Sequence, residues 1–207
     1  MNRHRQAELL LATKNKGKVP ELALLLAGIP LRLRTLAEFP RVTTPEETGA
    51  TFAENAELKA RFYASHTGLL TLADDSGLEA DALGGAPGVY SARYAGPDAT
   101  DEERIAQLLT EMRASIDSTR RARFVCAVAL FDPSAGACEL FEGTCEGRIG
   151  HEPRGSNGFG YDPVFIPDGF DQTFAELPAE IKQRISHRAQ ALAAARKTLA
   201  KAFPTHP

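Results

Sequence analysis

The sequence has no strong charge of either sign and no long hydrophobic run. Its 207 residues carry 24 Lys and Arg against 27 Asp and Glu, a formal net charge of -3. That balance gives no overall attraction to nucleic acid or to an anionic membrane, so we expect neither as a partner. No stretch approaches the ~20 apolar residues of a membrane span, and Leu9–Ala12 is too short for a signal-peptide core. The expected location is therefore the cytoplasm.

Cysteine is also scarce, and its spacing excludes the usual disulfide and zinc patterns. Cys126, Cys138 and Cys145 are odd in number, include no CxxC and have no His at a zinc-ligand spacing. We expect Cys126, which lies in an apolar run, to be a small core residue. Hydrophobic residues make up 43% of the chain, enough to bury a sizeable core. The length fits a single domain over residues 1–207, or one domain split into two lobes by a cleft.

Expected strands and helices alternate in the first half of the chain, and a hairpin follows. Thr51 with Glu54, and Thr100 with Glu103, have the spacing of helix-capping boxes. Apolar runs predict strands at Glu8–Ala12, Leu31–Leu33, Leu69–Ala73, Phe124–Phe131 and Cys138–Thr144. Helices are expected over Glu21–Leu26, from Thr51 to Gly68 with Phe52, Ala56, Lys59, Ala60 and Tyr63 at helical spacing, after Thr100, and over Ser186–Lys201. This order predicts an α/β fold, a mixed central sheet flanked by helices.

A lysine-rich loop between the first strand and the first helix is a candidate phosphate site. The loop reads Thr13-Lys14-Asn15-Lys16-Gly17-Lys18. Backbone N–H groups at a helix start bind anions, and three lysines add positive charge. It is not a Walker A loop, because Val19 follows Gly17-Lys18 where Ser or Thr would be required. A solvated lysine-rich turn is the alternative interpretation.

Two adjacent aspartates are the candidate metal or catalytic residues. Asp74 and Asp75 directly follow the expected strand Leu69–Ala73, and ligands of open α/β sheets gather at strand ends. Neighbouring carboxylates after a buried strand require a cation such as a divalent metal to neutralise them. An ordinary Asp-Ser-Gly turn is the alternative. Glu47, in the acidic loop Pro45–Gly49, is a candidate third carboxylate for Mg²⁺.

Two segments in the second half are candidates for binding a planar, anionic ligand. Gly155–Pro163 places Phe159 between two glycines and Tyr161 directly after one, and glycine lets a backbone approach a planar ligand closely. The alternative is a loop with two aromatic residues in the core. Lys182 and the run Ser186-His187-Arg188 supply cations, and a solvated helix start is the alternative there.

Together and in this order, the segments resemble the inosine/xanthosine triphosphate pyrophosphatases. The resemblance covers nearly the whole chain. It rests on Leu11–Lys18, Glu46–Gly49 with Phe52, Glu54, Asn55 and Ala56, Asp74–Leu78, Leu83–Tyr94, Gly158–Pro163 and Ser186–Arg188. It implies an elongated α/β fold with a cleft between two lobes. It also implies hydrolysis of ITP, dITP and XTP to monophosphate and pyrophosphate, an Mg²⁺ cofactor and a homodimer.

The resemblance also implies roles for individual residues. Asp75 is the general base, Lys18 assists at the phosphates, and Glu47, Asp74 and Asp75 organise Mg²⁺. The expected substrate-binding residues are Thr13, Lys14, Asn15, Lys16, Gly17, Lys18, Ser76, Phe159, Gly160, Tyr161, Asp162, Lys182, His187 and Arg188. Phe159 is the stacking surface for the purine. His187 and Arg188 are candidate donors to its 6-oxo group.

Two other functions fit parts of the sequence less well. A Maf-type pyrophosphatase for other modified nucleotides is disfavoured by the Ser-His-Arg and Gly-Phe-Gly-Tyr-Asp segments. A nucleotide-binding module without turnover is disfavoured by the three carboxylates, since extra negative charge without a metal weakens phosphate binding.

Overall fold

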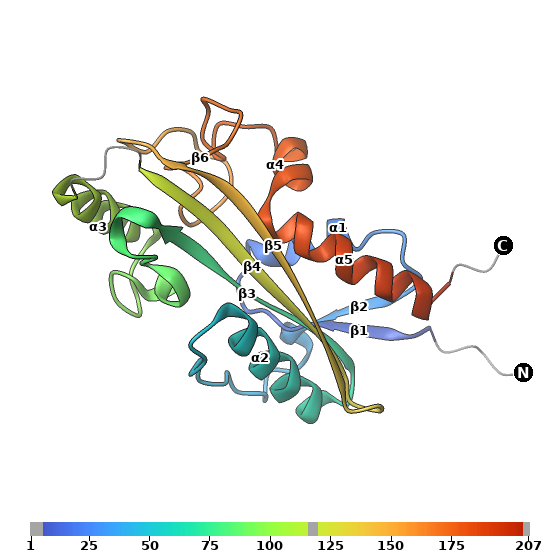
Figure 1. Ribbon diagram of the computed structural model, residues 1–207. Helices are drawn as coiled ribbons and strands as arrows, with labels where there is room; N and C mark the ends of the chain where they lie inside the picture. Colours follow the sequence, from blue (N-terminus) through green and yellow to red (C-terminus); the bar gives the residue numbers. More distant parts are fainter. Residues whose placement is uncertain (1–5, 116–119, 205–207) are drawn as a thin grey trace, which may run out of the picture. The chain divides into compact units, whose positions relative to one another are not determined.

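The computed structural model describes residues 6–115 and 120–204. Six strands of this described part form one sheet with the order β2-β1-β3-β4-β5-β6 (Figure 1). They are β1 (Glu8–Leu11), β2 (Arg32–Thr35), β3 (Leu70–Ala80), β4 (Arg121–Asp132), β5 (Ala137–Ile149) and β6 (Phe165–Pro167). Strand β1 is parallel to both β2 and β3, whereas β5 and β6 are antiparallel. The predicted mixed sheet is confirmed.

Helices separate and follow these strands, as the sequence predicts for an α/β fold. The α-helices are α1 (Lys18–Leu25), α2 (Phe52–Thr67), α3 (Asp101–Ala114), α4 (Ala179–Ile185) and α5 (His187–Ala202). Short 3₁₀ turns occur at η1 (Leu36–Glu38), η2 (Asp81–Leu83) and η3 (Gly88–Arg93). Within the described residues, no helix is long and apolar enough to cross a membrane.

Helix α2 begins and ends where its sequence signals predict. The Thr51 hydroxyl accepts a hydrogen bond from the Glu54 N–H at 3.1 Å, and the Glu54 carboxylate accepts one from the Thr51 N–H at 3.2 Å. This reciprocal pair satisfies two N–H groups that a helix start leaves without partners. Gly68 ends the helix with a φ of 68°, a left-handed conformation that glycine adopts without strain. The second predicted capping box, Thr100 with Glu103, opens α3 in the same way.

The described residues belong to two compact units. Unit 1 comprises Met1–Asp75, Ala127–Glu142 and Ala191–Pro207, and unit 2 comprises Ser76–Cys126 and Gly143–Gln190. The three strands β3, β4 and β5 therefore each contribute residues to both units. The predicted cleft between two lobes stays a prediction.

Each unit has its own buried apolar side chains. In unit 1, the three leucines of β1, Leu22 of α1, and Ala56 and Ala60 of α2 are each at most 1% exposed. In unit 2, a core joins α3, the ends of the long strands and the last loops. Its members include Leu78, Ile105, Leu108, Phe124, Tyr161, Phe165 and Phe174. Cys126 is fully buried, as predicted.

Several elements differ from the sequence-based expectation: strands β3, β4 and β5 are longer than predicted, and the short strand β6 was not predicted. Helix α1 begins at Lys18 rather than Glu21, so Pro20 lies in its first turn, where a missing N–H costs nothing. Strand β2 covers Arg32–Thr35 rather than Leu31–Leu33. Helix α4, which contains Lys182, was not expected as a separate element.

The largest correction concerns Asp74 and Asp75. We expected them to follow a strand that ends at Ala73, but β3 continues through both aspartates to Ala80. Aspartate is normally depleted in strands, and here each carboxylate contacts a lysine from a different helix. Those ion pairs make a charged pair compatible with a buried strand. The turn interpretation of Asp-Ser-Gly is also wrong.

Candidate active site

Asp74 and Asp75 lie side by side in the chain, but their carboxylates are directed to different helices. Successive side chains of a strand point to opposite faces. The Lys18 Nζ atom, at the first residue of α1, lies 2.7 Å from Asp74 Oδ2. The Lys59 Nζ atom, in α2, lies 2.8 Å from Asp75 Oδ1. Because Asp74 is 2% and Asp75 8% exposed, both ion pairs are largely shielded from water.

Lys59 joins two carboxylates that come from separate segments. Its Nζ atom lies 2.8 Å from Asp75 Oδ1 and 2.8 Å from Glu47 Oε1. Burial opposes the charge of Lys59, but Asp75, Asp74 and Glu47 outweigh it and raise the pKa of the ammonium. Lys59 is therefore the cation around which these carboxylates gather.

Asp75 is held in an environment that makes its carboxylate a better base. Burial raises its pKa above the ordinary value, while Lys59 pulls it in the other direction. The Asn55 side-chain amide also donates to Asp75 Oδ2 at 3.3 Å. A carboxylate with a raised pKa accepts a proton more readily near neutral pH.

Asn55 also fixes the acidic loop that carries Glu47. Its Oδ1 atom accepts a hydrogen bond from the Gly49 N–H at 2.8 Å, and its side chain is fully buried. A Cβ atom on Gly49 would lie 2.7 Å from Asn55 Oδ1 and 2.7 Å from the Glu54 Cβ. Only glycine leaves room for this approach, so the loop and the first turn of α2 are fitted to one another.

The loop Thr13–Gly17 turns through hydrogen bonds of its own. Asn15 Oδ1 accepts from the Gly17 N–H at 2.8 Å, and Thr13 Oγ1 accepts from the Asn15 N–H at 3.2 Å. Lys14 donates to Thr44 Oγ1 at 2.5 Å, and Lys16 is exposed. Of the three lysines, Lys18 is the one that forms an ion pair with a candidate catalytic carboxylate, Asp74, within the described part of the chain.

The carboxylates of this site are compatible with the expected Mg²⁺ ion, provided that waters and substrate phosphates complete its coordination shell. Among the described residues, no group of three His, Cys, Asp or Glu side chains is arranged to hold a metal ion. Mg²⁺ needs only one or two carboxylates when waters and substrate phosphates complete its shell. Asp75 and Glu47, bridged by one ammonium, offer hard oxygen ligands of this kind. The chemistry of the donor set therefore fits an ion that a phosphate ligand helps to hold.

A second cluster lies in unit 2, around the loop Gly158–Asp162. Asp162 Oδ2 accepts hydrogen bonds from the Phe159 N–H at 2.9 Å and from Lys182 Nζ at 2.6 Å. Lys182 Nζ lies 4.8 Å from the centre of the half-buried Phe159 ring, and the Arg188 guanidinium carbon lies 5.7 Å from it. A Cβ atom on Gly158 would collide with the Asp162 carboxylate. The ring of Phe159 in this loop therefore lies next to two cations, which come from α4 and α5.

The remaining predicted residues of unit 2 are more deeply buried. Arg188 is 1% exposed and donates to Ser76 Oγ at 3.1 Å. The His187 ring stacks on Phe124 with a centroid distance of 4.7 Å and an interplanar angle of 13°. The Tyr161 side chain belongs to the core of unit 2, where its hydroxyl donates to the Ser91 carbonyl at 2.9 Å.

The predicted residues thus fall into two sets. Unit 1 holds the lysine-rich loop with Glu47, Asp74 and Asp75, and unit 2 holds Ser76, Phe159–Asp162, Lys182, His187 and Arg188. The peptide bond between Asp75 and Ser76 links the two sets in the chain.

Sequence reasoning missed Asn55 and Lys59 as members of the site. Both lie on the buried face of α2, alongside Phe52, Ala56 and Tyr63. A polar amide and an ammonium in the apolar stripe of a helix require buried partners. That pattern was visible in the sequence and is the signal that would have found them.

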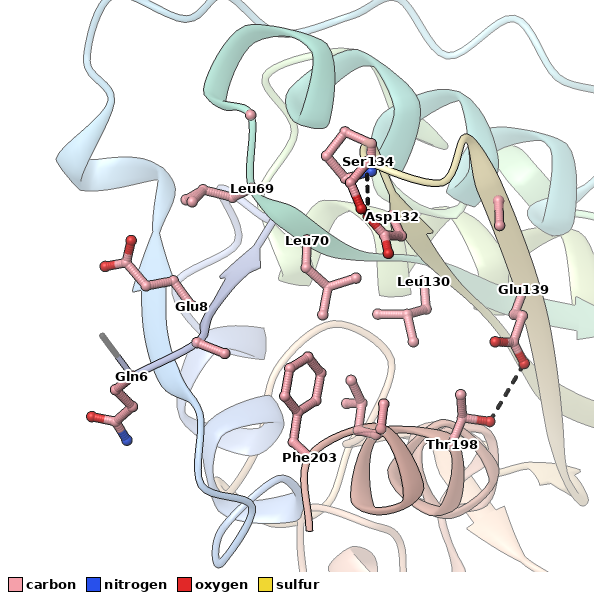
Figure 2. Close-up of a pocket in the computed structure, with 16 residues that line it drawn as sticks. Gln6, Glu8, Leu69, Leu70, Leu130, Asp132, Ser134, Glu139, Thr198 and Phe203 are labelled. Carbon is pink, nitrogen blue, oxygen red and sulfur yellow. Dashed lines mark hydrogen bonds between the residues drawn. The ribbon is translucent and has the colours of Figure 1, made fainter. Parts of the chain in front are cut away.

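A pocket in unit 1 lies away from all of these residues. It has a volume of about 540 Å³, and its lining residues include Glu8, Leu70, Leu130, Asp132, Glu139 and Phe203 (Figure 2). None of its lining residues is among the predicted site residues. Volume alone therefore does not identify the site, and we place it at the carboxylate and lysine cluster.

The fold and these clusters define an α/β protein with an all-oxygen carboxylate centre neutralised by lysines. A sequence model of the Ham1 family matches residues 9–198. The dITP/XTP pyrophosphatase of Exiguobacterium sp. is 49% identical over 95% of this chain and 97% of its own length. That of Desulforamulus reducens is 50% identical, with the same shares covered. The solved HAM1 protein of Coxiella burnetii superposes with a TM-score of 0.87 at 46% identity, covering 94% of this chain and 99% of its own. The chain belongs to the Ham1 family.

Proposed function

We propose that this protein hydrolyses the non-standard purine nucleoside triphosphates dITP, ITP and XTP to monophosphate and pyrophosphate. This reaction keeps deaminated purines out of DNA and RNA. The observation that carries the proposal is the Asp75 carboxylate, held by Lys59 and Asn55 beside Glu47. The names of the relatives support the substrate class, since dITP/XTP pyrophosphatases match this chain over nearly its whole length. All of residues 1–207 serve as one pyrophosphatase domain.

Asp75 takes a proton from the water that attacks the α-phosphorus, and pyrophosphate leaves on the opposite side. The raised pKa of Asp75 suits this role, because general-base catalysis is most efficient near the working pH. Lys59 orients the carboxylate through its short contact with Oδ1, so Oδ2 faces Asn55 and the reacting water.

Charge on the triphosphate is neutralised by Lys18 and by the backbone N–H groups of Thr13–Gly17. The helix start at Lys18 adds the favourable end of its dipole. Mg²⁺, held by Glu47 and Asp75 with Asp74 nearby, supplies further positive charge to the phosphate oxygens when it is bound. Asp74 acts chiefly by keeping Lys18 in place.

The purine lies against Phe159, with Lys182, His187 and Arg188 around it. Aromatic stacking contributes about 0.5–1.5 kcal/mol beyond area burial. Ser76 and Arg188 already contact one another, which fixes both groups for the ligand. The enzyme works in the cytoplasm, where the nucleotide pools lie, and as a homodimer.

The experiment that tests the proposed chemistry is a nucleotide panel with and without Mg²⁺, in which pyrophosphate and phosphate are assayed separately. We expect Mg²⁺-dependent release of pyrophosphate in equal amount to the monophosphate. Release of inorganic phosphate instead of pyrophosphate would show that the enzyme cleaves a phosphoanhydride bond other than the one between the α- and β-phosphates. Saturable binding without turnover would identify a nucleotide-binding module instead.

A further inference from the structure

The loop Gly158–Asp162 is held from two directions. On one side, Asp162 accepts the Phe159 N–H at 2.9 Å within the loop itself. On the other side, Asp101 Oδ2 accepts the Gly160 N–H at 2.6 Å, although Asp101 lies 59 residues earlier in the chain. Consecutive amide groups on either side of the Phe159 carbonyl are thus bonded to two different carboxylates.

Asp101 is itself fixed by its neighbours in α3 and η3. It is the first residue of α3, directly after the capping residue Thr100. Its other oxygen, Oδ1, lies 2.8 Å from Arg104 NH2. Arg104 in turn donates to the Ala92 carbonyl at 2.7 Å and to the Thr100 carbonyl at 3.1 Å. The carboxylate that receives the Gly160 amide therefore has little freedom to move.

The conformation of the loop explains why this contact is needed. Gly158 and Gly160 have φ values of 79° and 61°, so glycines flank Phe159 on both sides. Glycine imposes no preference of its own on the backbone, and such a segment samples many conformations unless something outside it holds it. A hydrogen bond from an amide to a carboxylate is charge-assisted and about twice as strong as one between neutral groups.

The position of the Phe159 ring is fixed only if the backbone of Phe159 is fixed. Lys182 and Arg188 contact the ring from elements outside the loop. These cation–ring contacts depend on where the Phe159–Gly160 peptide sits. The Asp101 carboxylate fixes that peptide from α3, a helix that contributes no residue to the predicted substrate set.

We propose that Asp101 is a positioning residue that sets the purine preference of the enzyme, by fixing the Phe159–Gly160 peptide against α3. It does not touch the substrate. The inference rests on the proposed function, because it takes Phe159 to be the surface on which the purine stacks. Without Asp101, the Phe159 ring is held less firmly, and the purine stacked on it is less well aligned with its hydrogen-bond donors. The ITP/ATP ratio of kcat/KM therefore falls more than kcat does.

Asp101 also has a general structural effect, which a control must remove. An acidic residue in the first turn of a helix is favourable through the helix dipole. Glu102, the next residue of α3, carries the same charge in the same turn and is exposed. Glu102→Ala therefore removes a first-turn charge without touching the loop. Asp101→Asn keeps an oxygen acceptor for the Gly160 amide and tests the hydrogen bond itself.

The test compares kcat and KM for ITP and ATP, with the melting temperature, in wild type, Asp101→Ala, Asp101→Asn and Glu102→Ala. We expect Asp101→Ala to raise KM for ITP and to lower the ITP/ATP ratio of kcat/KM by about tenfold, as for a lost charge-assisted hydrogen bond. Asp101→Asn should restore most of that ratio, and Glu102→Ala should leave it unchanged. The Gly160 amide resonance should shift most in Asp101→Ala, less in Asp101→Asn, and not in Glu102→Ala.

A wild-type ITP/ATP ratio in Asp101→Ala, with only the melting temperature lowered, would overturn the positioning role. Failure of Asp101→Asn to restore the ratio would do so too. Phe159→Ala separates the inference from the proposed function. If Phe159→Ala leaves KM for ITP unchanged, the proposed place of the purine is wrong. If Phe159→Ala raises that KM and Asp101→Ala does not, the proposal for Asp101 alone is wrong.

Discussion

Lys59 Nζ lies 2.8 Å from Asp75 Oδ1, and this ion pair between α2 and β3 is almost completely buried. The same ammonium contacts Glu47, so one lysine holds the candidate base and a candidate metal ligand together. Because Lys59 comes from a helix and Asp75 from the middle of a strand, the geometry of the pair depends on the packing of α2 against the sheet.

Lys59→Met should abolish turnover and destabilise the protein. Removing one partner of a buried ion pair leaves an uncompensated charge and costs about 3–5 kcal/mol of unfolding free energy. Lys59 also lowers the pKa of Asp75, so its loss raises that pKa further and moves any residual activity to higher pH. Urea denaturation and a pH–rate profile measure both effects. Lys197→Met, an exposed lysine of α5, is the control, and equal losses in the two variants would contradict a special role for Lys59.

Asp75→Asn should remove turnover while the protein stays folded and still binds nucleotide. The substitution keeps the shape of the side chain but removes the base, and general-base catalysis contributes about 10²–10⁴-fold. Steady-state kinetics and calorimetric titration with nucleotide give the two readings. Activity within a few-fold of wild type would exclude Asp75 as the base.

Lys18→Ala should weaken binding of triphosphate substrate much more than binding of monophosphate product. Lys18 stands at the start of α1, where backbone N–H groups and its ammonium would meet phosphate oxygens in the proposed site, and it also pairs with Asp74. Dissociation constants for a triphosphate and for its monophosphate, measured on wild type and variant, test this. An equal loss of affinity for the triphosphate and the monophosphate would contradict this. It would show that Lys18 contacts another part of the nucleotide or has a structural role only.

Gly49→Ala should disturb the acidic loop and lower the apparent affinity for Mg²⁺. The new Cβ would lie 2.7 Å from Asn55 Oδ1, so the loop and its Glu47 must shift away from α2. Activity titrated against Mg²⁺ measures the change. Gly150→Ala is the matched control, because the nearest atoms to a Cβ there are 3.5 Å away. An unchanged Mg²⁺ dependence in Gly49→Ala would show that the loop does not position a metal ligand.

Local signals in the sequence predicted much of the fold, but they did not predict that Asp74 and Asp75 lie within strand β3. Thr51, Glu54 and Gly68 determine the ends of α2 through contacts within a few residues, and these ends were predicted. The continuation of β3 through Asp74 and Asp75 depends on lysines 56 and 16 residues away in sequence, whose proximity no local pattern reveals. The ion pairs that decide the course of β3 are tertiary contacts.

The site shows the same division. The carboxylates Glu47, Asp74 and Asp75 and the loop Thr13–Lys18 were selected from residue type and order. Lys59 entered the sequence analysis only as one of the residues at helical spacing in α2. Its burial between two carboxylates shows its part in the site, which its position in the apolar stripe of α2 could already have indicated.

The central claim, that the enzyme selects deaminated purines, is tested most directly by kcat/KM for ITP, XTP, GTP and ATP in one pyrophosphate assay. In the proposed site, donors such as His187 and Arg188 would pair with a 6-oxo group, whereas the amine of ATP would face them and leave buried groups unpaired. Sites of this kind reject an analogue that lacks the bonded group by about 10⁴–10⁵. We predict that ITP and XTP exceed ATP by several orders of magnitude, with GTP also poor. Comparable values for ATP and ITP would contradict the claim, while leaving the pyrophosphatase chemistry intact.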